Sequence, residues 1–287
     1  MIPEEFVIQI DDELLQDGVA LHARPMGVLA RWMRDNGISG DILDERYYSP
    51  LRQAYDRLYP EGDFGLPPML EGGVGFRDQV FLVRANVGFG TFAIDPKDSI
   101  EISQSALLQV WQNSPRQFWR SYYVVADIWD FAYGASDLRG NAETDALLAN
   151  AHGHITAVAR ALRAAGNAAA VVQSACLVAE LSMKGVLAQA GVPEPDRRRL
   201  GHHLPELAEA VIARMPNSDD DRLRSTVQAF PNFINSRYEH HGMSRIGLID
   251  LMHRSQFVAA DSVRRLTERN LAGQLNDDTS FPARETW

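Results

Sequence analysis

The chain of 287 residues has a single cysteine, and only two of its 28 basic residues are lysines. One cysteine excludes an internal disulfide. Cys176 lies in an alanine- and valine-rich stretch, so we expect a buried structural thiol rather than a nucleophile. No uncharged apolar run approaches the ~18–20 residues that cross a bilayer, and the acidic start lacks the basic-then-apolar order of a signal peptide. These absences predict a cytoplasmic protein with no membrane partner.

The motifs of the common nucleotide-binding and hydrolase folds are also missing. There is no Gly-rich phosphate loop, Rossmann fingerprint or Gly-x-Ser-x-Gly elbow, which excludes the usual kinase, dehydrogenase and hydrolase classes. Four of the eight histidines form two vicinal pairs, not the His-x3-His or Cys-x2-Cys spacing that organises zinc. We therefore expect no metal and no cofactor.

The net charge of −10 is unevenly distributed along the chain. Residues 1–105 carry 18 acidic and 9 basic side chains, a net of −9, whereas residues 106–287 carry 20 and 19, a net of −1. Seven of the eight histidines also lie in the second part. Because the overall field repels a polyanion, any affinity for phosphate must come from a local patch in this second part.

The first hundred residues predict an acidic α+β domain over about residues 1–102, whose motifs indicate no reaction. Alternating apolar and polar residues favour a strand, and the proline and glycine positions favour helix ends and turns. The expected elements are a strand at Phe6–Ile10, helices at Pro25–Asn36 and Asp44–Leu58, a loop at Pro67–Gly75, and a hairpin of Gln79–Arg84 and Gly90–Ile94.

From residue 103 to residue 273 the pattern predicts a helical domain, followed by a flexible tail over 274–287. Aromatic residues recur at helical spacing near its start, a pattern typical of packing rather than of base stacking. The expected helices are Gln104–Gln112, Arg116–Tyr133, Glu143–Ala164, Ala168–Ala190, Leu204–Arg214, Arg222–Phe230 and Ile246–Ala272.

Glu180 and Lys184 lie four residues apart on an otherwise apolar helix, which is followed by the turn Gly201-His202-His203. A glutamate that precedes a lysine by four residues can pair with it along a helix. Because a buried ion pair is costly unless further polar groups complete it, we expect the turn to fold back and supply them. The cluster is interpreted either as a structural device that fixes the helix hairpin or as part of a ligand site.

A second polar group, Arg237-Tyr238-Glu239-His240-His241, directly precedes the last long helix. Arginine presents a charged fork to phosphate oxygens, and histidine exchanges protons near neutral pH. Together they could cleave RNA without a metal, with the guanidinium stabilising the phosphorane and an imidazole acting as acid or base. Alternatively, Arg237 and Tyr238 are structural or bind phosphate, and His240 and His241 are solvated.

These two groups together resemble the HEPN family, an all-α fold found in RNA-cleaving toxins, antiviral defence proteins and nucleotide-binding modules. The resemblance covers about residues 143–272 and implies a mainly α chain, with a HEPN-like helical bundle after the smaller α+β domain. It also implies a homodimer. In the family, four to six residues separate the arginine from the histidine, whereas here three separate Arg237 from His241 and two separate Arg237 from His240.

The resemblance therefore implies a bacterial protein of a defence or toxin–antitoxin system, with RNA or a nucleotide as ligand and an antitoxin or another protein as partner. Arg237, His241 and His240 would be catalytic in an endoribonuclease. Ligand contacts would come from Tyr238, Arg197, Arg198, His202, His203, Glu180 and Lys184. The alternative is a catalytically silent helical module that binds a nucleotide or a partner protein, and a purely structural dimerisation domain is a third interpretation.

Overall fold

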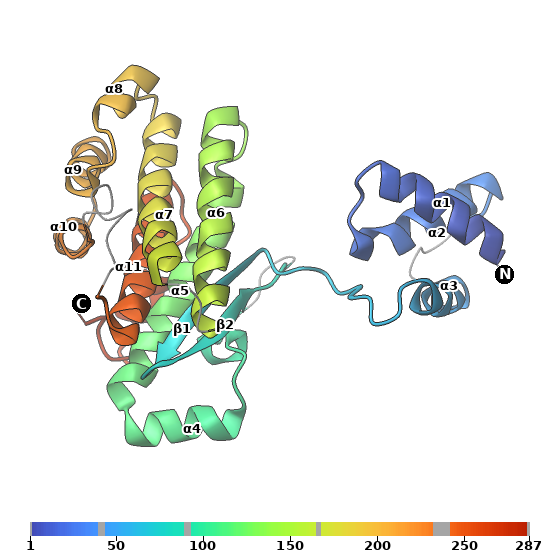
Figure 1. Cartoon of the computed structure of the whole chain (residues 1–287), viewed down its shortest axis with the longest axis horizontal. Helices are drawn as coiled ribbons and strands as arrows, with labels where there is room; N and C mark the ends of the chain where they lie inside the picture. Colours follow the sequence, from blue (N-terminus) through green and yellow to red (C-terminus); the bar gives the residue numbers. More distant parts are fainter. Residues whose placement is uncertain (1, 40–43, 89–92, 165–167, 232–241, 286–287) are drawn as a thin grey trace. The chain divides into compact units, whose positions relative to one another are not determined.

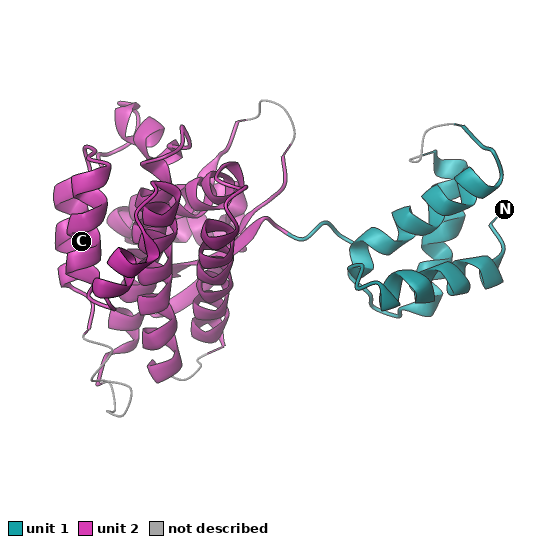
Figure 2. Cartoon of the chain, turned by 90° about the horizontal axis from the view of Figure 1, so that it is seen from above, with its two compact units in different colours: residues 1–67 teal, residues 68–287 magenta. Residues whose placement is uncertain are grey.

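The computed structural model describes residues 2–39, 44–88, 93–164, 168–231 and 242–285 (Figure 1). The chain forms two compact units, residues 1–67 and 68–287 (Figure 2). The division falls after Pro67, earlier than the predicted boundary near residue 102, because the hairpin that follows packs with the later helices. The described residues are mainly helical, as expected, with one small two-stranded sheet.

The described part of the first unit contains three α-helices: α1 (Glu4–Gln16), α2 (Arg24–Asp35) and α3 (Glu45–Leu58), with a short 3-10 helix, η1 (Leu21–Ala23), before α2. The helices predicted at α2 and α3 are confirmed, and the Asp44 side chain caps α3 by accepting from the Arg46 amide. Val7 and Ile10 of α1 enter an apolar core with Leu29 and Tyr55.

The strand predicted at Phe6–Ile10 is wrong, because these residues lie within α1. Alternation over five residues is too short to separate strand from helix. The spacing of the buried residues is that of a helix, because Val7 and Ile10 lie three residues apart on one buried face. The next residue, Asp11, accepts a 2.8 Å hydrogen bond from the Tyr55 hydroxyl.

The second unit begins with an antiparallel hairpin of β1 (Leu70–Phe76) and β2 (Gln79–Ala85), in which Leu70 pairs with Ala85 and Phe76 with Gln79. Arg77, at the turn, has a φ of 57°. The predicted hairpin pairs the wrong segments. Its first strand, Gln79–Arg84, is the second strand of the observed hairpin and pairs with the preceding β1. Residues 90–92 of its other predicted strand, Gly90–Ile94, lie outside the described residues, and the loop predicted at Pro67–Gly75 contains most of β1.

The glycines of β1 explain this difference. An added Cβ would lie 2.5 Å from the Ile128 side chain at Gly72 and 2.2 Å from the Ile249 side chain at Gly75. Glycine is therefore present because helices approach the strand closely. In addition, the Gln256 side chain accepts from the Gly73 amide and donates to its carbonyl, both at 2.9 Å.

The remaining described elements of this unit are helical. The expected helices are confirmed to within a few residues at their ends, except that the last one ends at Arg264. The structure also has three short helical elements that were not predicted: η2, α8 and α12. In order, the helical elements are η2 (Pro96–Ser99, 3-10), α4 (Gln104–Asn113), α5 (Pro115–Asp137), α6 (Ala142–Arg163), α7 (Ala168–Gln189), α8 (Glu194–Arg199), α9 (Leu204–Arg214), α10 (Asp220–Gln228), α11 (Arg245–Arg264) and α12 (Leu271–Asp277).

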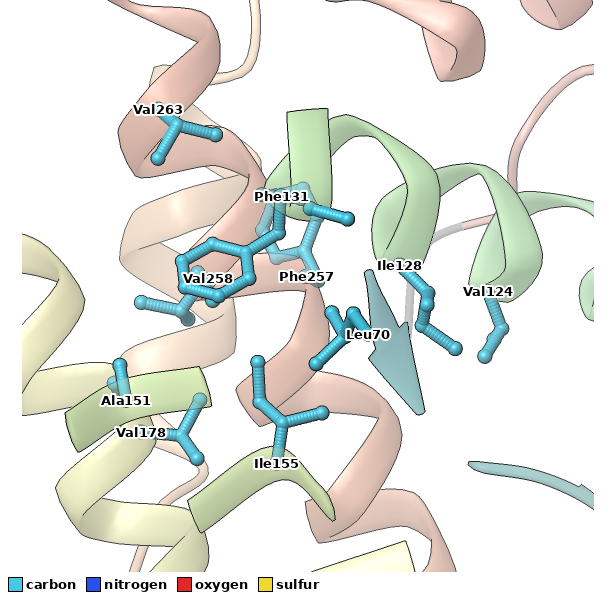
Figure 3. Close-up of a cluster of buried hydrophobic side chains, with 14 of the residues drawn as sticks. Leu70, Val124, Ile128, Phe131, Ala151, Ile155, Val178, Phe257, Val258 and Val263 are labelled. Atoms are coloured by element: carbon cyan, nitrogen blue, oxygen red, sulfur yellow. The ribbon is translucent and has the colours of Figure 1, made fainter. Parts of the chain in front are cut away.

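The core of the second unit lies between α5, α6, α7 and α11, beside β1 (Figure 3). Phe131 of α5 and Phe257 of α11 meet there, with Ile155 of α6, Val178 of α7 and Leu70 of β1 around them. All five side chains are almost fully buried. Burying apolar side chains on this scale is the main stabilising contribution to the unit.

Helix α7 is long and apolar enough to cross a membrane by length and composition alone, although Glu180 and Lys184 interrupt it. Most of its apolar window (67%) is buried inside the unit. It packs against α6, α9 and α11, so its composition follows from its central position in the bundle.

The tail predicted to be flexible over 274–287 instead packs on the unit as far as residue 285. Leu275 of α12 is buried. Beyond α12, the Phe281 ring lies 5.7 Å from that of Trp119 in an edge-on contact, and Arg284 forms an ion pair with Asp127. The prediction failed because the partners of these residues lie on α5, more than a hundred residues earlier.

Candidate functional site

Glu180 is the centre of the polar cluster that was predicted between α7 and the turn before α9. Its carboxylate accepts a 2.7 Å hydrogen bond from Lys184 Nζ and lies 2.8 Å from His202 Nδ1. The expected pairing along the helix and the contribution of the turn are both confirmed. Glu180 is the most buried of the three side chains: the exposed fraction is 4% for Glu180, 17% for Lys184 and 47% for His202.

Local backbone geometry places His202 over α7. Helix α8 ends at Arg199, and Gly201 has a φ of 58°, the left-handed conformation that glycine adopts at little cost. His203 follows in an extended conformation as the N-cap of α9, with no side-chain capping bond, and its side chain is exposed. The turn therefore directs the two histidines differently: one contacts Glu180 and the other faces solvent.

The Glu180 carboxylate is already paired with other side chains of the protein. Glu180 is buried and engaged by an ammonium and an imidazole, so its charge is compensated within the fold. One helical turn before it, burial raises the pKa of the Cys176 thiol to about 12, which leaves that sulfur protonated and unreactive. These features favour the structural interpretation of Glu180 and Lys184.

The three arginines at 197–199 lie in helix α8. Arg197 is buried and donates to the Val192 carbonyl and the Glu143 carboxylate. Arg198 pairs with Glu194 at 2.5 Å, and Arg199 pairs with Asp196. Each guanidinium therefore has a carboxylate partner, and Arg197, which is buried, could reach a ligand phosphate only by giving up its own.

The residues predicted to be catalytic, Arg237, His240 and His241, lie outside the described residues, together with Tyr238. The residues on either side of that segment are placed. Phe230 and Met243 both pack on the apolar cluster that contains Leu162, Val171 and Leu248. The described residues on the two sides of this segment therefore contact the same cluster, and Met243 directly precedes the N-cap of α11 at Ser244.

A further set of polar and aromatic side chains lies on α5 and was assigned only to packing from the sequence. Arg116, Trp119, Arg120 and Tyr123 are spaced i, i+3, i+4 and i+7, so they share one face of the helix. They line a cavity of about 310 Å³ closed on its other side by residues 282–285. The helical spacing of two arginines with two aromatic residues was the available signal, but the opposing wall was not predictable.

Among the described residues no group of three histidine, cysteine, aspartate or glutamate side chains is arranged to hold a metal ion. Two half-buried histidines of α6, His152 and His154, have a pKa below the ordinary value because burial penalises the imidazolium. These residues lie apart in sequence from the cluster at Glu180 and were not predicted as site residues.

No protein-family model, no curated protein and no solved structure matches this chain.

Proposed function

We propose that this chain is a HEPN-like bacterial protein directed at RNA, acting in the cytoplasm as a homodimer within a defence or toxin–antitoxin system. The observation that supports it is the Glu180 cluster. The glutamate, lysine and Gly-His turn on which the resemblance rests meet in one contact network, in a unit that is mainly helical. In this proposal the cluster fixes the helix hairpin, and the chemistry belongs to the residues before α11.

As an enzyme, the protein would be a metal-independent endoribonuclease. His241 or His240 takes the proton of a ribose 2′-hydroxyl, and the 2′-oxygen attacks the adjacent phosphorus. Arg237 stabilises the charge of the pentavalent phosphorane, after which the 5′-oxygen leaves with a proton. The products are a 2′,3′-cyclic phosphate and a 5′-hydroxyl end, which identify this route.

Incubation of the purified full chain with total RNA, with and without EDTA, tests this function. We expect cleavage in both conditions, with cyclic phosphate ends, and loss of cleavage in Arg237→Ala without a change in the circular-dichroism melting curve. Arg224→Gln is a matched control, because Arg224 is a partly exposed arginine that pairs with Glu209. Equal cleavage by wild type and Arg237→Ala would rule out the assignment.

The short spacing between Arg237 and the two histidines favours a second function, a catalytically silent HEPN-like module that binds a nucleotide or a partner protein. Intact RNA after incubation, together with thermal stabilisation by a ligand or by an antitoxin-like partner, would select it. A monomeric mass by light scattering at tens of micromolar would contradict the homodimer under either function.

A further inference from the structure

A cavity lies between α5 and the C-terminal segment of the second unit, and none of its lining residues is among those assigned above. Arg116, Trp119, Arg120 and Tyr123 form one wall, and the segment from Pro282 to Glu285 forms the other. Its volume of about 310 Å³ is at the lower end of the range of small-molecule sites. This volume suits a single nucleotide-sized ligand.

The opposing wall is held in place by buried ionic contacts. Asp127 of α5 has no exposed surface and accepts a 2.9 Å bond from Arg284 Nη1, while Arg264 of α11 donates to the same carboxylate at 2.6 Å. The Tyr123 hydroxyl donates to the Pro282 carbonyl at 2.8 Å. Because these bonds fix both walls, the cavity is preformed.

Arginine side chains lie beside the aromatic residues of the cavity. The Arg284 guanidinium lies 5.5 Å from the centre of the Tyr123 ring. Two further arginines, Arg116 and Arg120, line the same cavity from α5. An aromatic ring carrying an anionic group complements such a site, because the ring can stack and the anion can pair with arginine.

An anionic group of this chain already occupies part of the site. The Glu285 carboxylate receives two hydrogen bonds from Arg116, Nε to Oε1 and Nη2 to Oε2, both at 2.9 Å. The hydrogen bond with Arg116 lowers the pKa of Glu285, so the pair stays ionised. Both side chains are largely solvent-exposed, so the contact is weak enough for an external anion to replace it.

We infer that this cavity binds a nucleoside monophosphate, with the base against Trp119 and the phosphate on Arg116 in place of the Glu285 carboxylate. Arg120, held at 2.7 Å by Asp250, provides a second cation on the same helix face. The Glu285 carboxylate then competes with the ligand phosphate for Arg116 and is displaced when the ligand binds. This inference does not rest on the ribonuclease proposal.

Isothermal titration of the full chain with AMP tests the site, with adenosine and inorganic phosphate as separate titrants. We expect AMP to bind more tightly than either fragment. Arg116→Gln should weaken AMP binding about tenfold, because it removes the bidentate cation. Glu285→Gln should tighten it about two- to fivefold, because the competing carboxylate is neutralised.

Arg224→Gln is the matched control, since Arg224 also makes a bidentate pair, with Glu209, at distances of 2.8 and 3.1 Å. It should bind AMP as the wild type does. The inference is overturned if AMP binds to neither wild type nor Glu285→Gln, if Arg116→Gln binds unchanged, or if phosphate alone binds as tightly as AMP. RNA cleavage that persists in Arg116→Gln leaves the proposed function standing whatever the AMP result.

Discussion

The carboxylate of Glu180 lies 2.8 Å from Nδ1 of His202, a residue that follows it by 22 positions. The last turns of α7, the short helix α8 and the turn at Gly201 separate the two residues in the sequence. Their contact closes the hairpin between α7 and α9. Lys184 completes the group from the next turn of α7. A buried charge thus joins two elements that otherwise meet through apolar side chains.

Replacing Glu180 with Gln should destabilise the second unit by about 1–3 kcal/mol. The change leaves the largely buried Lys184 without its anion, and removing one partner of a buried pair costs up to about 5 kcal/mol before allowance for partial exposure. Urea unfolding followed by circular dichroism measures it. The control Glu209→Gln removes an exposed partner of Arg224 and should leave the midpoint unchanged. Equal midpoints for Glu180→Gln and wild type would contradict the structural role.

Stability should fall as the pH drops from 7 to 5, in part because of His253. Its Nε2 accepts a 3.0 Å hydrogen bond from the Gly75 amide, and burial holds its pKa well below the ordinary value. The folded protein therefore keeps this imidazole neutral while the unfolded chain binds a proton below about pH 6.5, a loss approaching about 1.4 kcal/mol per pH unit.

The variant His253→Gln isolates this effect, because glutamine can still accept from Gly75 but does not titrate. Its unfolding free energy, measured by urea titration across this pH range, should depend less steeply on pH than that of the wild type. His152 and His154 contribute in the same direction and remain in the variant. The exposed His203→Gln serves as the control for a histidine-to-glutamine change at the surface. An unchanged slope in His253→Gln would refute the assignment.

Gly75→Ala should destabilise the protein by about 1–3 kcal/mol, the usual cost of overpacking. The new methyl would lie 2.2 Å from Ile249 Cγ2, so β1 and α11 would have to separate. Gly153→Ala, within α6, meets nothing within 4 Å and should instead stabilise by about 0.5–1 kcal/mol. Thermal unfolding of the two variants should shift in opposite directions, and a common shift would argue against this packing.

Asp127→Asn should cost about 3–5 kcal/mol, because Arg264 and Arg284 lose a buried anion. It should also speed tryptic cleavage after Arg284, which mass spectrometry detects. Asp137→Asn is the control: Asp137 pairs with Arg269 at 2.6 Å on the surface, where the loss should be small. Cleavage after Arg284 at the wild-type rate in Asp127→Asn would contradict this anchoring role.

Most helices could be predicted because their signals are local. The Asp44 cap, Pro115 at the start of α5 and the positive φ of Gly191 after α7 each act within a few residues. The pair of Glu180 and Lys184 was predictable for the same reason. The strand β1 was not, because its glycines indicate a loop until the helices that approach them are known.

By itself, then, the sequence determined where most of the long helices form, since capping, helical periodicity and i, i+4 pairing depend on neighbours along the chain. Only the tertiary structure decided which charges meet: the partner of Arg284 is Asp127, and that of Arg116 is Glu285, each more than 150 positions away. Such pairs depend on how helices cross and on which surface water can reach. No pattern along the chain encodes either, so the cavity beside α5 emerges only once the helices have packed.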